Sequence, residues 1–184
     1  MTWTHKLTAS IATLIIIFFI VNCTPVNAYE DTDATTYSWG TIYTNDGFEK
    51  TFTIYKESDN YGVTEYGDEI TYTIEFQCTK KKIEVLLYSD PIGIYPSSNF
   101  NQRGSGLMRV DGGKIQKISY VTLKDSSGIA FWTPKTISRA FLQGSKDVLF
   151  KIPSSVQNDA VARFIVGDFN DYASKFKSLG CSLR

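Results

Sequence analysis

Hydrophobic and polar residues alternate along much of this chain, with the period of two that places successive side chains on opposite faces of a β-strand. The clearest example is the segment 70–78. Its odd positions are mostly polar, and its even positions are all nonpolar or aromatic: Ile70, Tyr72, Ile74, Phe76 and Cys78. We therefore expect one face of this strand to be buried, with Cys78 pointing inward.

Turn-forming residues separate the other predicted strands. Asn45-Asp46-Gly47 lies between segments 38–44 and 48–55, and Asp111-Gly112-Gly113 lies between 107–110 and 115–123. Three lysines make a charged turn before a strand at 83–89. Further strands are expected at 129–132, 147–152 and 160–166. Short strands joined by tight turns are typical of an antiparallel meander.

The segment 90–106 predicts a long irregular loop, because it contains two prolines and three glycines. We interpret Gly104-Ser105-Gly106 within it as a turn, since it lacks the spacing of a nucleophile elbow. Long loops in compact domains are often functional, so Phe100, Gln102 and Arg103 are candidate binding residues.

Helical spacing occurs only late in the chain. Thr136 is expected to cap a short helix over 136–143 that ends near Gly144. A final helix is expected after Asp168, with an apolar stripe typical of core packing, and Gly180 ends it. The predicted fold class is mainly β (α+β): an antiparallel β-sandwich or meander with these two helices.

The first 28 residues have the features of a secretory signal peptide, with Lys6 before an apolar run over 11–21 and cleavage expected after Ala28. Two alternatives stay open. An uncleaved anchor matches less well because polar residues interrupt the start of the run. Lipid attachment at Cys23 matches less well because Asn22 stands where a small residue is expected. Each alternative predicts export, to the periplasm or the medium; cleavage leaves no stable membrane span.

The remaining residues, 29–184, have the size and hydrophobic content of one β-rich domain. They contain two cysteines, Cys78 and Cys181. An even number of cysteines in an exported chain favours a disulfide. We therefore predict that this bond tethers the C-terminal helix to the strand at 70–78.

Charge divides the domain into two parts. Residues 29–69 carry ten acids and two bases, whereas residues 70–184 carry nine acids and sixteen bases. Seven of the tyrosines fall among residues 29–72. The acidic part either folds over the basic module or contacts a separate partner. Because the net charge of the whole chain is near zero, no overall positive field would attract nucleic acid.

Catalytic chemistry is restricted because the only histidine, His5, lies in the expected signal peptide. This excludes histidine-based triads, histidine general bases and His-ligated zinc in the mature chain. No cofactor, metal site or enzymatic activity is predicted. Paired carboxylates remain chemically available for glycan hydrolysis, among them Glu69, Glu75, Glu84 and Asp111.

Binding is the favoured function class. Tyrosine suits contact surfaces, and the tyrosines of the acidic part are candidates for one. A basic set is a second candidate that would meet an anionic envelope polymer or a lipid surface: Lys80, Lys81, Lys82, Arg103 and Arg109, with Lys114 and Lys117.

One further indication comes from the order of elements over 70–181. The chain has, in order, a strand with a cysteine, a strand that ends in Arg109-Val110-Asp111, a strand with Trp132 and a short helix over 137–142. A strand at 148–152, the segment Ala162-Arg163-Phe164-Ile165-Val166-Gly167 and a closing helix that ends at Cys181 follow. This order resembles the type VI secretion-associated VasI-like periplasmic proteins and, more loosely, the invasion-associated locus B-like proteins. The resemblance implies a β-rich envelope domain without assigned activity.

The sequence thus predicts an exported, non-enzymatic interaction protein of the envelope or of a secretion system, with another envelope or secreted protein as its partner. Two alternatives are an inhibitor or immunity-type protein that blocks a partner enzyme, and a carboxylate-based hydrolase of an envelope glycan.

Overall fold

The computed structural model describes residues 38–45, 47, 49–60, 62–63, 69–90, 102–124, 128–144, 146–153 and 160–183. The expected signal peptide, the possible lipid attachment site Cys23, most of the candidate loop with Phe100, and the start of the acidic part lie outside these residues.

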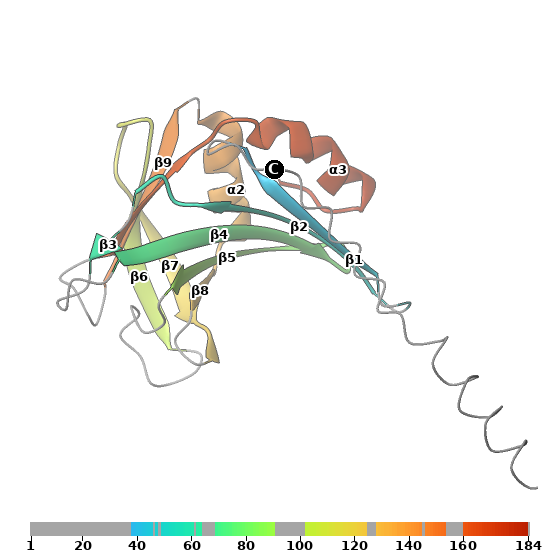
Figure 1. The fold of residues 1–184 in the computed structure, drawn as a ribbon, viewed down its shortest axis with the longest axis horizontal. Coiled ribbons are helices and arrows are strands. Elements are labelled where there is room, and N and C mark those ends of the chain that lie inside the picture. The colour runs from blue at the N-terminus through green and yellow to red at the C-terminus, as the bar shows by residue number, and fades with distance from the viewer. Residues whose placement is uncertain are drawn as a thin grey trace, which may run out of the picture.

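The described residues form ten strands, two short α-helices and one 3₁₀ helix (Figure 1). Their bounds are β1 (Gly40–Asn45), β2 (Lys50–Glu57), β3 (Gly62–Val63), β4 (Glu69–Thr79), β5 (Lys82–Asp90), β6 (Arg103–Val110), β7 (Gln116–Thr122), β8 (Gly128–Phe131), α2 (Pro134–Gln143), β9 (Asp147–Ile152), β10 (Ala160–Ile165), η2 (Phe169–Tyr172) and α3 (Ala173–Ser178).

The strands pair in the order β1-β2-β4-β5-β8-β7-β6-β9-β10, while the short β3 pairs with β4 outside this path. All of these pairs are antiparallel. The sheet curves strongly, so that β6 and β7 run steeply across the direction of β4 and β5 (Figure 1). The predicted fold class is confirmed: the protein is mainly β and antiparallel, with a short helix and a C-terminal helix.

The curvature brings the end of β2 to the outer edge of β10. The backbone N–H of Asp59 donates to the carbonyl of Arg163 at 2.7 Å, and the Asn60 side chain accepts from the Arg163 N–H at 2.6 Å. Asn60 also donates to the carbonyl of Val161, and the Asp59 carboxylate accepts from the N–H of Ile165. These bonds occupy backbone groups that an open edge strand would leave available for aggregation.

An aromatic cluster fills the space between the curved sheet and α2. Trp39, Phe76, Phe141 and Phe169 are all buried, and the centroid of the Trp39 ring lies 4.9–5.7 Å from those of the three phenylalanines. The Trp39 indole N–H donates to the carbonyl of Val166 at 2.8 Å, which satisfies its one polar atom. The cluster therefore joins the first described residues to α2 and to η2.

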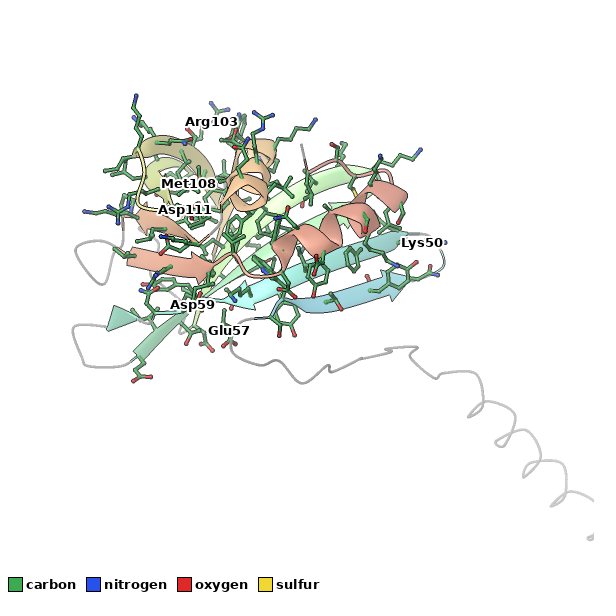
Figure 2. The ribbon with its side chains drawn as sticks, turned by 90° about the horizontal axis from the view of Figure 1, so that it is seen from above. Lys50, Glu57, Asp59, Arg103, Met108 and Asp111 are labelled. Carbon is green, nitrogen blue, oxygen red and sulfur yellow. A yellow bond between two sulfur atoms is a disulfide. The ribbon has the colours of Figure 1, made fainter. Side chains whose placement is uncertain are left out.

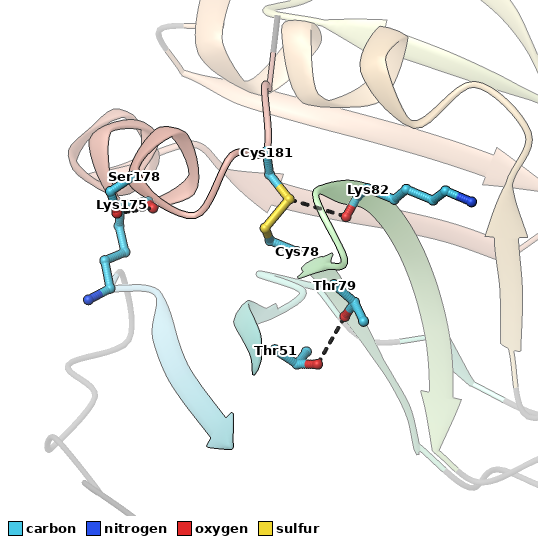
Figure 3. The surroundings of a disulfide bond; sticks show 7 residues. All are labelled: Thr51, Cys78, Thr79, Lys82, Lys175, Ser178 and Cys181. Atoms are coloured by element: carbon cyan, nitrogen blue, oxygen red, sulfur yellow. Dashed lines mark hydrogen bonds between the residues drawn. A yellow bond between two sulfur atoms is a disulfide. The ribbon is translucent and has the colours of Figure 1, made fainter. Parts of the chain in front are cut away.

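The predicted disulfide is confirmed. Cys78 on β4 and Cys181 after α3 are bonded, with their Cα atoms 5.9 Å apart (Figure 3). Phe176 of α3 packs edge-on against Phe52 of β2, with ring centroids 5.2 Å apart. The C-terminal helix is thus held to the sheet by one covalent bond and one buried aromatic contact.

The predicted loop over 90–106 is wrong at its C-terminal end, because β6 begins at Arg103 and includes Gly104-Ser105-Gly106. The two glycines have packing roles. A Cβ at residue 104 would lie 2.3 Å from the ring of Tyr120, and one at residue 106 would lie 2.5 Å from the side chain of Ile152. These glycines therefore make room for inward-facing neighbours and do not form a turn.

The helix boundaries also differ from those predicted. Helix α2 begins at Pro134, with Thr133 and not Thr136 at the N-cap position, because the fixed φ of proline suits the first helical turn. The C-terminal segment begins as the 3₁₀ helix η2, and the side chain of Asp168 makes no capping hydrogen bond. Gly180, with φ of +81°, follows the end of α3 as expected.

Candidate binding face

One exposed face of the sheet combines aliphatic and cationic side chains on β7, β6, β9 and β10. On β6 the exposed positions are the odd ones, while Met108 points into the core. The same alternation holds on β7, β9 and β10. We call this surface the outer basic face and define it by Leu107, Arg109, Lys117, Leu149, Lys151, Val161 and Arg163.

The pairing register alternates the two kinds of side chain in a first row. Leu107 on β6 lies directly opposite Lys117 on β7 and Lys151 on β9. Lys151 in turn lies opposite Val161 on β10. Side chains at directly opposed positions are neighbours, with Cβ atoms about 5 Å apart. Each aliphatic side chain in this row therefore has a cation beside it.

A second row repeats the arrangement. Leu149 on β9 lies between Arg109 on β6 and Arg163 on β10. Arg163 forms an ion pair with Asp147, with Nη2 and Oδ2 2.7 Å apart. Asp147 is the single acid at the outward positions of these four strands. The face consequently has an excess of positive charge.

A shallow groove of about 230 Å³ runs between the aliphatic side chains of this face. Its lining includes Leu107, Ile115, Leu149 and Val161. Leu107, Ile115 and Val161 are 40, 58 and 39 % exposed. These values are high for large aliphatic residues, so the groove offers apolar contact area to a partner.

Arg103 and Arg109, both predicted to bind a partner, lie at opposite ends of β6. Arg109 belongs to the outer basic face. The Arg103 guanidinium lies over the ring of Trp132, 4.6 Å from its centroid, and Trp132 is 57 % exposed. A cation stacked on an exposed aromatic ring is held in place by the ring's negative face.

The three predicted lysines lie elsewhere, at the turn between β4 and β5. Lys80 and Lys81 both have positive φ, and Lys80 forms an ion pair with Glu49 at 3.0 Å. A second hollow there includes Lys50, which Figure 2 shows far from Arg103 and Met108. The structure thus separates the predicted basic set into the turn cluster, Arg103 and Arg109 on β6, Lys114 between β6 and β7, and Lys117 on β7.

Sequence reasoning did not single out Leu107, Leu149, Lys151, Val161 or Arg163 for binding. Their outward positions follow from the period of two, which could have identified them strand by strand. The register that places β9 beside β6 was the missing information, because β7, β8 and α2 separate these two strands in the chain.

A charged cluster around one buried lysine lies near the end of β2. Lys56 is 4 % exposed, and burial lowers the pKa of its ammonium, opposed by the nearby carboxylates of Asp59 and Asp168. Burial, followed by the effect of Asp168, raises the pKa of Tyr172. The cluster links β2 to the segment that carries η2.

Two of the four carboxylates considered for glycan hydrolysis have other contacts. Asp111 accepts hydrogen bonds from the backbone N–H groups of Lys146 and Asp147, and Glu75 accepts one from Gln77. These contacts hold Asp111 and Glu75 on different strands and turns of the sheet. Within the described ranges, no group of three His, Cys, Asp or Glu side chains has the arrangement of a metal site.

None of the helices in the described part of the chain is long and apolar enough to cross a bilayer. Comparison with known proteins finds no matching family model, curated protein or solved structure.

Proposed function

We propose that this protein is an exported, non-catalytic binding protein that holds an anionic partner of the cell envelope against its outer basic face. The single observation that carries the proposal is the alternation of cations and exposed aliphatic side chains across four paired strands. Such a surface attracts an anionic partner at long range and offers apolar contact at short range.

The Cys78–Cys181 bond supports export, because disulfides persist mainly in oxidising compartments. The signal-like segment before Tyr29 supports the same location. N-terminal sequencing of protein purified from the envelope or the medium tests this part, with Tyr29 as the expected first residue.

Binding to a soluble polyanion tests the proposed face. Mature protein is titrated with fluorescent poly-L-glutamate at low and at raised salt. We expect binding that weakens with salt and that falls about tenfold in the double variant Arg109→Gln/Lys117→Gln, because both are exposed cations of the face.

The matched control is Lys175→Gln/Lys177→Gln, which removes the same charge from exposed positions of α3. Equal losses in the two double variants would show that net charge, and not the outer basic face, determines binding. Absence of any binding by the wild-type protein would contradict the proposed function.

A further inference from the structure

We infer that the anionic partner of the outer basic face is a lipid bilayer surface: the exposed aliphatic side chains enter the boundary between headgroups and acyl chains, while the flanking cations contact anionic headgroups. This inference rests on the proposed function and names the partner that the face fits best.

The composition of the face favours lipid over protein. The centres of protein–protein interfaces are enriched in aromatic residues and depleted in lysine. Unlike these centres, the outward positions of β6, β7, β9 and β10 include lysines beside aliphatic residues and no aromatic residue; arginine, which they also contain, is common to both kinds of surface. Basic residues beside exposed aliphatic ones are typical of surfaces that lie in the interfacial region of a membrane.

The size of the groove also favours a lipid surface over an enclosed small molecule. At about 230 Å³ it is smaller than the roughly 300–1,000 Å³ of ordinary small-molecule sites. It is also open, since Leu107, Ile115 and Val161 project into solvent at its rim. A surface with projecting apolar side chains suits shallow insertion better than enclosure of a ligand.

The cations are placed to contact headgroups during such insertion. Lys117 and Lys151 flank Leu107 in the first row, while Arg109 flanks Leu149 in the second. Long lysine and arginine side chains can extend their charged ends toward a polar layer while their methylene stems stay beside apolar groups. Each aliphatic side chain can then enter the bilayer without burying a charge.

Vesicle co-sedimentation tests the inference. Mature protein is mixed with vesicles of phosphatidylcholine alone or of phosphatidylcholine with phosphatidylglycerol. We expect partition onto the anionic vesicles only, weakening as salt is raised. The double variant Leu107→Ser/Val161→Ser removes the aliphatic tips and keeps every charge. It is expected to lower partition about tenfold and to leave poly-L-glutamate binding unchanged.

The variant Arg109→Gln/Lys117→Gln is expected to weaken binding to both poly-L-glutamate and the anionic vesicles. The control Lys175→Gln/Lys177→Gln is expected to leave binding to both probes unchanged. Thermal unfolding of each variant shows that its fold is retained. Polyanion binding without vesicle binding, or vesicle binding that Leu107→Ser/Val161→Ser leaves unchanged, would overturn the inference while the proposed function stands. If the wild-type protein binds neither poly-L-glutamate nor the vesicles, both the inference and the proposed function are overturned.

Discussion

The ring of Tyr120 on β7 covers Gly104, its register partner on β6. Tyr120 is 3 % exposed, and a Cβ at residue 104 would lie 2.3 Å from its Cζ atom. The glycine thus leaves space for a buried aromatic ring on the neighbouring strand. The same contact fixes the register of the two strands that present Leu107 and Lys117 on the opposite side.

Gly104→Ala is expected to lower the free energy of unfolding by about 1–3 kcal/mol, because the buried Tyr120 ring has no room to move away. Gly40→Ala is the matched control. A Cβ at residue 40 would lie the same 2.3 Å from the ring of Tyr55, but Tyr55 is only partly buried and its ring can swing outward. Urea unfolding should therefore show a smaller loss for Gly40→Ala, and equal losses would contradict this explanation.

Removal of the disulfide in the double variant Cys78→Ala/Cys181→Ala is expected to destabilise the protein by up to about 4–5 kcal/mol, because the bond closes a long loop of the unfolded chain. The two cysteines are 103 positions apart in the sequence. Urea unfolding measures the loss, and thiol labelling of the denatured mature protein should find no free sulfur. Protein that labels at both sulfurs would contradict the bond.

Asn60→Ala is expected to expose the edge of β10, because the Asn60 side chain bonds both the N–H of Arg163 and the carbonyl of Val161. Loss of these bonds should cost about 1–3 kcal/mol and leave an edge open to self-association. Hydrogen exchange at the Arg163 amide should accelerate, and size-exclusion chromatography should detect oligomers at high concentration.

Asn170→Ala supplies the control for this variant, because Asn170 is an exposed asparagine in η2, away from the β10 edge. Unchanged exchange at Arg163 in Asn60→Ala would show that the backbone edge is protected by other means.

Local patterns account for much of the fold. The turn at 45–47 is confirmed, since Asn45 pairs with Lys50 and the Asn45 side chain accepts from the N–H of Gly47. The strand at 147–152 has the predicted bounds. Both features depend on neighbouring residues, which is why the sequence alone could predict them.

Long-range pairing accounts for what could not be predicted. Asp59 and Asn60 look like ordinary turn residues, yet they cover the edge of a strand about 100 positions later in the chain. Similarly, Leu107 acquires its neighbour Lys151 only because β6 pairs with β9. A run of three lysines draws attention in a sequence, whereas the outer basic face is assembled from single residues on four strands.

The hydroxyl of Tyr172 in η2 donates to the backbone carbonyl of Trp39 at 3.0 Å, so it holds the start of the described chain against its C-terminal segment. Burial raises the pKa of Tyr172, and the carboxylates of Asp168 and Asp171 raise it further. Below the unfolded-state pKa of about 10, the phenol is protonated and the bond contributes its full stability. That contribution is lost as pH rises through the higher folded-state pKa, because a phenolate cannot donate.

Tyr172→Phe is therefore expected to lower the free energy of unfolding by about 1 kcal/mol near neutral pH and by less as the medium becomes strongly alkaline.

The pKa values of two other buried groups are also shifted. Burial raises the pKa of Tyr120, which acts in the same direction as Tyr172, and lowers that of Lys56, which adds stability as pH rises. Both are present in wild type and variant, so they cancel in the difference between the two proteins. Urea unfolding of both proteins across this pH range measures the difference in their free energies of unfolding. If that difference stays constant into strongly alkaline medium, the Tyr172 hydroxyl does not titrate as proposed.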